Sequence, residues 1–507
     1  MIGIRALARA LATMAAAAMV TAVVGCLPVA PAPSPGDQTP RPVGRPTVEA
    51  GSVSAGSTWR PNIILITADD ATTYDLDAMP LTRALLADHG LAFTEAVSPH
   101  PLCCPARAQL LTGQYAQNNG VHHNSGPFGG FKALDPSSTV ATWLGAAGYR
   151  TAFVGKYLNE YTSTDRRQPG WTWWDPLVRG IYDYGDFTFW NNDRRRMAAY
   201  SDSYVTDILT DRAVRIVGRF ARSGDPFFVW VSHVAPHDAF ELDTGLWGTP
   251  VPARRHEDLF ADARPPSLDK PSFNEPDVSD QPADLATKAP VNPRVVVHSY
   301  RERSRSLVAV DESVAAVVRR LRSIGELRNT FIIFTSDNGF ALGEHRWIGK
   351  DRLTDEILRV PLLVRGPGVQ AGGRSDRRVA LVDLPVTIAG IAAARPGIRV
   401  DGQSFLPTLR SRPQAWRDTQ LVLTGDETRP WTWRGVRTAR YTYARNWQSG
   451  ERALYDRKLD PFEVDNVAAD PAYSAIMREL ARRLALLRDC SGAGCVLRLG
   501  PVPGPSA

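Results

Sequence analysis

Cysteine is scarce in this chain, and the few cysteines are not arranged as metal ligands. Five occur in 507 residues, with no C-x-x-C pair and no histidines at a matching spacing. Because structural zinc sites depend on such spacing, the sequence excludes a zinc-finger type of site. Clustered positive charge is also lacking, since the net charge of +6 comes from basic residues spread along the chain. We therefore expect no nucleic-acid partner.

The apolar stretch at the N-terminus is too short to span a membrane and has the flanks of a secretory signal. Arg5 and Arg9 precede the run LATMAAAAMVTAVVG, which ends before Cys26. This pattern predicts a signal peptide over 1–25 and an exported protein. The tetrapeptide VVGC at Cys26 resembles a bacterial lipobox, whose lipid would anchor the protein at the cell surface as its only membrane contact. The alternative is ordinary cleavage and free secretion.

Composition and pattern divide the rest of the chain into three parts. Residues 26–58 are rich in Pro, Ser and Gly and are typical of a flexible tether. Apolar strand-like runs alternate with helical patterns over 59–404. Short β-like runs and one helix, over 472–489, follow in 405–507. These patterns predict an α/β protein with a central, mostly parallel sheet flanked by helices, plus a small C-terminal domain of antiparallel sheet and helix.

Four apolar, β-branched runs predict strands that are buried on both faces. These runs cover 62–67, 151–154, 226–232 and 331–335, and a fifth run covers 360–364. Charged or polar residues follow the ends of the first four runs: Asp69 and Asp70, Lys156, His237, and Asp337 with Asn338. Because ligand sites gather beyond the carboxyl ends of strands in such sheets, we expect these side chains to share one site.

Helical periodicity is clear elsewhere but missing in two long segments. Helices are predicted over 80–90, from 105 onward, over 139–148, 203–222, 300–324 and 383–394. Residues 157–200 are aromatic and charged without periodicity, which suits either a sugar-binding wall or a loop-rich satellite core. Residues 248–295 carry many prolines and charges and predict a long surface excursion.

One short motif indicates a reactive position at a helix start. Cys103, Pro105 and Arg107 form the pattern C-x-P-x-R. Proline suits a first helical turn, whose unpaired N–H groups favour negative charge. Arg107 lies one turn later and can point its guanidinium back toward position 103. The pattern alone is equally typical of a buried cysteine beside a helix start.

A resemblance to a known family goes further. The run CCPARAQLLTGQYAQNNGVHHN, which starts at Cys103, resembles the signature of type I sulfatases. The family's order is also kept by PNIILITADD, FVGKYLNEY, APHDAF, TSDNGFALGEH, RVPLLVRGPGV and ALYDRKLDPFEVDNVAADP. GKYLNEY and the late cysteine pair make the chain most similar to the N-acetylglucosamine-6-sulfatase branch. Ala341 and the pair Glu344-His345 depart from that branch and leave the sugar open.

The resemblance implies a fold, a reaction and a set of site residues. The large domain would be alkaline-phosphatase-like, and a formylglycine-generating enzyme would convert Cys103 to formylglycine, whose hydrate attacks the sulfur of a sulfated carbohydrate. One Ca²⁺, rather than Mg²⁺, would be held by oxygen-bearing side chains: Asp69, Asp70, Asp337, Asn338 and the modified residue 103. Four residues would bind the sulfate or protonate the leaving alcohol: Arg107, Lys156, His237 and Lys350.

The remaining cysteines are expected to have structural roles. With Cys26 lipidated and Cys103 modified, Cys490 and Cys495 are the expected disulfide partners in an oxidising compartment. Cys104 is expected to pack as a small apolar residue.

One alternative to the sulfatase function is a phosphonate or phosphodiester hydrolase that uses the same modified nucleophile. The other is a substrate-binding lipoprotein in which Cys103 is never converted.

Overall fold

The computed structural model describes residues 60–192 and 196–505. The predicted signal peptide, the tether and Cys26 lie outside these residues. Among the helices of the described residues, none is both long and apolar enough to cross a membrane.

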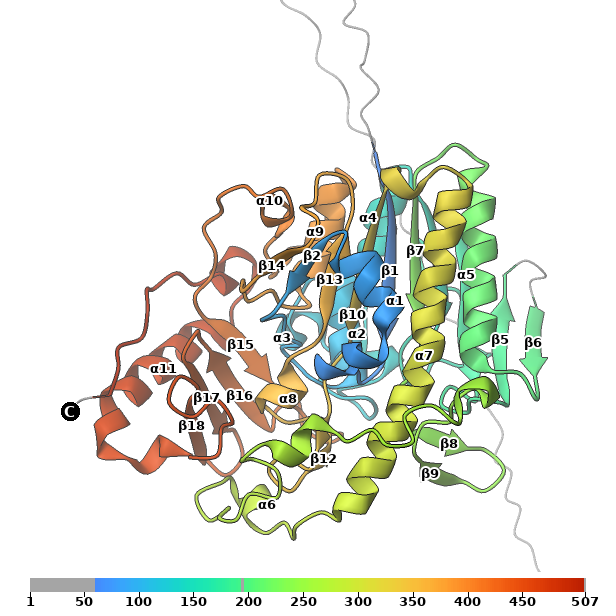
Figure 1. Ribbon diagram of the computed structural model, residues 1–507. Helices are drawn as coiled ribbons and strands as arrows, with labels where there is room; N and C mark the ends of the chain where they lie inside the picture. The colour runs from blue at the N-terminus through green and yellow to red at the C-terminus, as the bar shows by residue number, and fades with distance from the viewer. Residues whose placement is uncertain (1–59, 193–195, 506–507) are drawn as a thin grey trace, which may run out of the picture. The chain divides into compact units, whose positions relative to one another are not determined.

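A ten-stranded sheet forms the centre of the larger part of the molecule (Figure 1). Its strand order is β14-β2-β13-β10-β1-β7-β3-β4-β5-β6. The five neighbours from β10 to β4 run parallel, whereas β13 and β5 pair antiparallel with the two ends of this block. The strands are β1 Asn62–Ala68, β2 Leu91–Phe93, β3 Arg150–Gly155, β4 Trp173–Arg179, β5 Phe187–Asn191, β6 Arg196–Tyr200, β7 Phe227–Ser232, β10 Thr330–Ser336, β13 Leu362–Arg365 and β14 Gly373–Ser375. The predicted central, mostly parallel sheet is confirmed.

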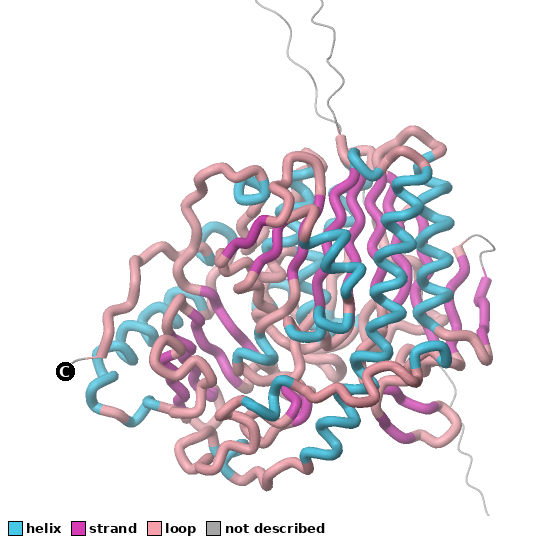
Figure 2. Tube along the Cα trace, viewed as in Figure 1, coloured by secondary structure: helices cyan, strands magenta, loops and turns pink. Residues whose placement is uncertain are grey.

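Alternation along β1 creates two hydrophobic layers. Ile63 and Leu65 pack with the helices of one face, and Ile64 and Ile66 with those of the other. Every residue of β1 is buried, as expected for a parallel strand covered on both sides. The first face carries α2 Cys103–Thr112, α4 Val140–Ala146 and α9 Asp383–Ile391. The second carries η1 Tyr74–Ala78, α1 Pro80–Thr82, η2 Arg83–Ala87, α5 Val205–Ala221 and α7 Pro293–Ser323. Figure 2 shows these helices along the strands.

The C-terminal part forms a second sheet with one helix against it (Figure 1). Its four strands are antiparallel and follow chain order: β15 Gln420–Leu423, β16 Trp433–Arg437, β17 Tyr441–Asn446 and β18 Arg452–Asp456. Leu421, Val436 and Leu454 of the sheet share a core with Ile476 and Leu480 of α11, which spans Ser474–Leu487. This is the predicted antiparallel sheet and helix; the domain boundary after residue 404 stays a prediction.

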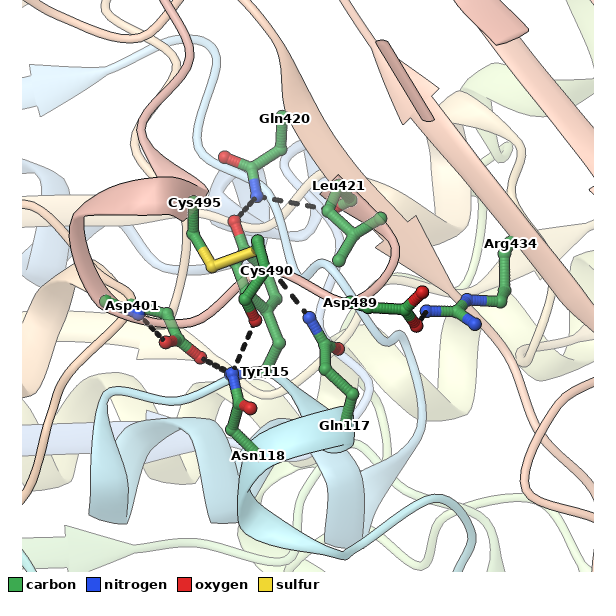
Figure 3. The surroundings of a disulfide bond; sticks show 11 residues. Tyr115, Gln117, Asn118, Asp401, Gln420, Leu421, Arg434, Asp489, Cys490 and Cys495 are labelled. Carbon is green, nitrogen blue, oxygen red and sulfur yellow. Dashed lines mark hydrogen bonds and ion pairs between the residues drawn. A yellow bond between two sulfur atoms is a disulfide. The ribbon is translucent and has the colours of Figure 1, made fainter. Parts of the chain in front are cut away.

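A disulfide joins Cys490 to Cys495 beyond α11 (Figure 3). Its short loop is attached to the segment that follows the signature helix. Asn118 donates through Nδ2 to the Cys490 carbonyl and to Asp401 Oδ2, each over 2.8 Å. The backbone N–H of Gly492 donates to Asp401 Oδ1 over 2.7 Å. Asp401 therefore connects the two segments.

The segment 157–200, which lacks periodicity in sequence, forms the regular strands β4, β5 and β6. The sequence pattern suited either a sugar-binding wall or a loop-rich satellite core, and the three strands, joined by loops, do not decide between the two. Its aromatic residues serve two purposes: Trp171 and Trp174 are buried against Phe153, and Tyr182 lies at the site described below. The strand β4 is buried, but Asp175 and Pro176 interrupt its apolar run, and β5 and the edge strand β6 carry mixed, partly exposed residues.

Two helix starts lie earlier than predicted. The helix α7 begins at Pro293, because the side chain of Asn292 accepts from the Arg294 N–H and proline suits the first position. The helix α2 begins at Cys103. The remaining short elements are α3 Ala116–Asn119, η3 Phe131–Ala133, β8 Ala239–Glu241, β9 Leu246–Gly248, η4 Arg254–His256, η5 Pro266–Asp269, α6 Ala283–Ala286, η6 Leu327–Asn329, β11 Ala341–Leu342, β12 Ile348–Gly349, α8 Asp355–Leu358, α10 Leu406–Leu409, η7 Val467–Ala469, η8 Pro471–Tyr473 and η9 Gly492–Cys495.

Candidate active site

The signature helix α2 is buried along its whole length and begins at the site. Cys103 is its first residue, and Pro105 lies in the first turn, where no intrahelical partner for its missing N–H is needed. The helix ends at Gly113, whose φ of 67° suits glycine. The positive end of the helix dipole therefore lies at Cys103.

The predicted strand-end residues come together around this helix start. Asp69 and Asp70 follow β1, Lys156 follows β3, and Asp337 follows β10, all of them buried. The cis-proline turn after β7 presents His237 to the same place. Neighbouring parallel strands end at the same edge of a sheet, which explains why residues far apart in sequence meet here.

Arg107 is the buried connection between the helix and the ends of four strands, β1, β3, β7 and β10. Its Nε donates to Asp337 Oδ2 over 2.8 Å, and its Nη2 lies 3.3 Å from Asp69 Oδ2. Its Nη1 donates to the Lys156 carbonyl over 2.7 Å and to Ser232 Oγ over 2.6 Å. Arg107 is therefore committed to fixing the two carboxylates and the strand ends. A guanidinium held in this way positions its neighbours and adds positive charge to the site.

Two lysines complete the charged group. The ammonium of Lys156 is hydrogen-bonded to Asp69 Oδ2. Lys350 Nζ lies 2.6 and 2.8 Å from the two oxygens of Asp70 and 3.1 Å from Cys103 Sγ. Burial works to lower the pKa of both lysines, but the paired aspartates raise the pKa of each above its ordinary value. Both lysines are therefore charged at neutral pH and hold protons beside residue 103.

The same pairing controls the carboxylates. Burial works to raise the pKa of Asp69 and Asp70, but Lys156 and Lys350 respectively hold each pKa below its usual value. Asp337 differs: burial and the nearby charge of Asp69 raise its pKa to about 6. Its Oδ1 accepts the backbone N–H of Asp70 over 3.1 Å, so it also shapes the turn after β1.

The two adjacent cysteines have different surroundings. Cys103 Sγ lies 3.6 Å from Asp69 Oδ1, and burial raises the pKa of its thiol. Cys104 Sγ accepts the Asn159 N–H over 3.0 Å and lies 3.5 Å from Asn159 Oδ1, while burial raises its pKa to about 12. The expectation that Cys104 packs as an apolar residue was incomplete, because its sulfur has polar partners.

His237 is neutral in this arrangement. Its Nδ1–H donates to the Asp238 carbonyl over 2.7 Å, which leaves Nε2 as an acceptor 3.7 Å from Asp70 Oδ2. Burial and the positive charge of Lys350 lower the pKa of His237 to about 3. The ring of Tyr182 stacks on His237 with centroids 4.2 Å apart.

The oxygen donors of this site fit a hard cation, whereas Cys103 and His237 contribute softer sulfur and nitrogen atoms. Asp69, Asp70, Cys103 and His237 each offer a ligand atom, and these atoms lie within 4.8 Å of one another. Asn338 adds a buried Oδ1 that has no hydrogen-bond partner among the residues described here. Carboxylate and amide oxygens are the ligands that Ca²⁺ and Mg²⁺ take. The sequence prediction named four of these residues as ligands and His237 as a catalytic residue.

Sequence reasoning missed the roles of Ser232 and Tyr182. Ser232 is the last residue of β7 and accepts from Arg107, but a serine at a strand end has no distinctive pattern. Tyr182 was noted as one of several aromatic residues. Its ring lies 4.6 Å from Lys156 Nζ, a cation–π distance.

Comparison with known families places this geometry in context. The family model described as sulfatase matches residues 61–394, and that described as N-sulphoglucosamine sulphohydrolase, C-terminal, matches residues 343–490. An arylsulfatase of Volvox carteri is 32% identical over 504 residues, which cover 88% of this chain and 77% of the relative. An N-acetylglucosamine-6-sulfatase of Capra hircus is 31% identical and is matched over 88% of this chain and 86% of its own.

Solved structures agree on the fold. A protein solved in complex with its substrate D-glucosamine-2-N,6-O-disulfate superposes with a TM-score of 0.71 at 24% identity, covering 84% of this chain and 97% of that one. The predicted alkaline-phosphatase-like fold is confirmed, and N-acetylglucosamine-6-sulfatases stand among the similar relatives, as the sequence motifs indicated. The chain therefore belongs to the sulfatase family and is a sulfuric ester hydrolase.

Proposed function

We propose that this protein is an exported, calcium-dependent sulfatase that removes sulfate from a carbohydrate, with N-acetylglucosamine-6-sulfate as the best candidate substrate. The observation that carries the proposal is the contact of Cys103 with Lys350 inside a buried group of three cations and three carboxylates. A binding protein without chemistry would not need a reactive position enclosed by these charges.

The nucleophile is proposed to be formylglycine, made from Cys103 by a formylglycine-generating enzyme. Support comes from the thiol itself. A cysteine with a pKa raised by burial is a poor nucleophile at neutral pH, because the thiolate is the reactive form. Modification would give this buried position a function that the thiol lacks.

The cation is proposed to be Ca²⁺, held by Asp69, Asp70, Asp337, Asn338 and residue 103. When bound, it would polarise the oxygens of the sulfate and lower the pKa of the nucleophile. The carboxylates and the buried acceptor of Asn338 support this assignment. Ca²⁺ is preferred to Mg²⁺ because carboxylate-rich cages without strict octahedral geometry suit the larger ion.

The cationic side chains would bind and orient the anionic ester. The ammonium group of Lys156 pairs with Asp69, and that of Lys350 pairs with Asp70. Arg107 adds a third positive charge. Such preorganised charge stabilises the negative charge that moves toward the leaving oxygen. Lys350 carries a proton beside residue 103, whereas His237 is neutral with an accepting Nε2. Of the two, Lys350 is better suited to donate a proton to the leaving alcohol, and His237 to accept one.

The N-terminal sequence supports export, with a lipid on Cys26 and no other membrane contact. The motif GKYLNEY and the similarity to the N-acetylglucosamine-6-sulfatase of Capra hircus support a 6-O-sulfated amino sugar as the substrate, and the similarity to the arylsulfatase of Volvox carteri is the reason to test an aryl sulfate beside it. The same residues would also accept a phosphonate or phosphate ester, which makes substrate preference the decisive measurement.

The test is turnover of three esters by protein purified from its native host. We expect kcat/KM for N-acetylglucosamine-6-sulfate to exceed that for 4-nitrophenyl sulfate, and both to exceed that for phenyl phenylphosphonate. Preference for the phosphonate would favour the alternative hydrolase. Absence of turnover with all three would favour the binding lipoprotein.

A further inference from the structure

An exposed tryptophan lies on a short hairpin directly after the site histidine. The strands β8 and β9 follow His237 in the chain and carry Trp247, which is 59% exposed. The hairpin is attached to the site, because the Phe240 N–H donates to the Tyr182 carbonyl over 3.0 Å. Large aromatic side chains at the surface are informative when they adjoin a functional site.

Trp247 ends a row of aromatic rings that begins at the charged group. The ring of Tyr182 stacks on His237 with centroids 4.2 Å apart, and its centroid lies 5.4 Å from that of Trp247. Trp247 is itself 5.9 Å from His237 and 5.1 Å from Phe240. These spacings place the indole about one sugar ring from the residues that face the reacting sulfate.

The register of the hairpin determines which side chains face the site. Phe240 pairs with Trp247, and Glu241 pairs with Leu246. Successive residues of a strand point to opposite faces, so Leu246 lies on the face away from Tyr182 and His237. Leu246 is 66% exposed, a fraction close to that of Trp247. It is therefore a matched control for a substitution on this hairpin.

The aromatic surface of the hairpin and the neighbouring charged group together favour a sugar sulfate as the ligand. A pyranose ring has apolar C–H faces and a rim of hydroxyl groups. Its face packs on an indole while the hydroxyls stay in contact with water or polar groups. A sulfate carried on the exocyclic C6–O6 arm of that ring would point to the lysines. A flat aromatic surface beside a group of cationic side chains matches both halves of such a molecule.

We propose that Trp247, supported by Phe240 and Tyr182, forms a carbohydrate-stacking subsite that holds the sugar ring bearing the sulfate. The inference rests on the proposed function, since it assigns the substrate of that site to pyranose sulfates. It also means that Trp247, which lies outside the charged group, determines the specificity for sugar sulfates over other sulfate esters.

The test measures binding, so it does not depend on turnover. Titration calorimetry with N-acetylglucosamine-6-sulfate and, separately, inorganic sulfate is carried out on the Cys103→Ala protein and on its combinations with Trp247→Ala, Trp247→Phe and Leu246→Ala. We expect Trp247→Ala to weaken sugar-sulfate binding by about 10-fold or more, as for an aromatic anchor that the bound ligand covers. Trp247→Phe is expected to keep most of the affinity, and Leu246→Ala all of it. Inorganic sulfate should bind equally to all four proteins.

Three outcomes would overturn the subsite. They are unchanged sugar-sulfate binding in Trp247→Ala, equal losses in Trp247→Ala and Leu246→Ala, and absence of sugar-sulfate binding by a protein that binds inorganic sulfate. A change in oligomeric state on Trp247→Ala, with sugar binding intact, would likewise assign the indole to self-association. Failure of the proposed function would give a different pattern of results. The Cys103→Ala protein would bind the sugar sulfate through Trp247, but the protein that keeps Cys103 would not turn it over.

Discussion

Arg107 Nε donates to Asp337 Oδ2 over 2.8 Å in the buried interior, and this ion pair joins the signature helix to the end of the strand β10. The two residues are 230 positions apart in the sequence. Their contact fixes both the start of the reactive helix and one proposed metal ligand.

Asp337→Ala is expected to remove turnover and the calcium-dependent rise in Tm together. Loss of the carboxylate removes a ligand and leaves Arg107 buried without this partner, which costs about 3–5 kcal/mol of stability. Asp337→Asn keeps the shape and serves as the second variant. Calcium titrations followed by thermal denaturation measure the effect, with Asp186→Ala, an exposed partner of Arg179, as the control. A full calcium response in both Asp337 variants would show that the metal assignment is wrong.

Lys350→Ala is expected to lower kcat/KM for sulfate esters by about 100- to 1,000-fold, because the ammonium lies beside residue 103 and stabilises charge there. Steady-state kinetics with the sugar sulfate measure the loss. Lys132 is exposed, so the variant Lys132→Ala is the control and should keep wild-type kinetics. Wild-type kcat/KM in Lys350→Ala would exclude Lys350 from the reaction.

His345 is expected to make stability depend on pH. Its Nδ1 lies 2.9 Å from Glu275 Oε2, and although burial works to lower the pKa of His345, this hydrogen bond raises it above 6.5. The folded protein therefore binds this proton more tightly than the unfolded chain. The resulting stabilisation is complete below about pH 6.5 and is lost as pH rises through the higher folded pKa.

The measurement for this pair is the difference in Tm between wild type and His345→Gln across pH 5 to 9. The difference should be largest at acidic pH and shrink toward pH 9, with a stability loss of about 2 kcal/mol at the acidic end. His298→Gln, at an exposed position, should show little difference at any pH. A difference that grows with pH would contradict this interpretation of the pair.

The disulfide is expected to contribute to stability more than to activity. It closes a loop with a sequence separation of 5, for which the chain-entropy model gives about 2 kcal/mol. The double variant Cys490→Ala/Cys495→Ala should therefore melt at a lower temperature with kcat/KM retained. Loss of activity in the folded variant would mean that the loop, through Asn118, also positions the signature helix.

The sequence predicted the parallel core and its strand-end residues for a definite physical reason. Strands covered on both faces are continuous apolar runs, and the polar residues that follow them stand out by contrast. The strands β4 to β6 had no such contrast, because Asp175 and Pro176 interrupt the buried β4 and because β5 and β6 are partly exposed. Local pattern also says nothing of the antiparallel direction of β13, which depends on the path of the chain between strands.

The hydrogen bonds and ion pairs within the site could not be predicted from the sequence pattern, for a similar reason. Arg107 was expected to face residue 103, yet its guanidinium contacts Asp337, Asp69 and Ser232. Such contacts depend on how distant strand ends meet. Tyr182 illustrates the same point, since nothing local separates it from the aromatic residues that fill the core.

The central claim is that residue 103 is a modified nucleophile, and the mass of the peptide containing Cys103 tests it most directly. Protein from the native host is digested and the peptide is measured by mass spectrometry. The account predicts an aldehyde or its hydrate at position 103 in a substantial fraction of molecules. An unmodified thiol in every molecule would contradict it and would make the binding lipoprotein the better interpretation.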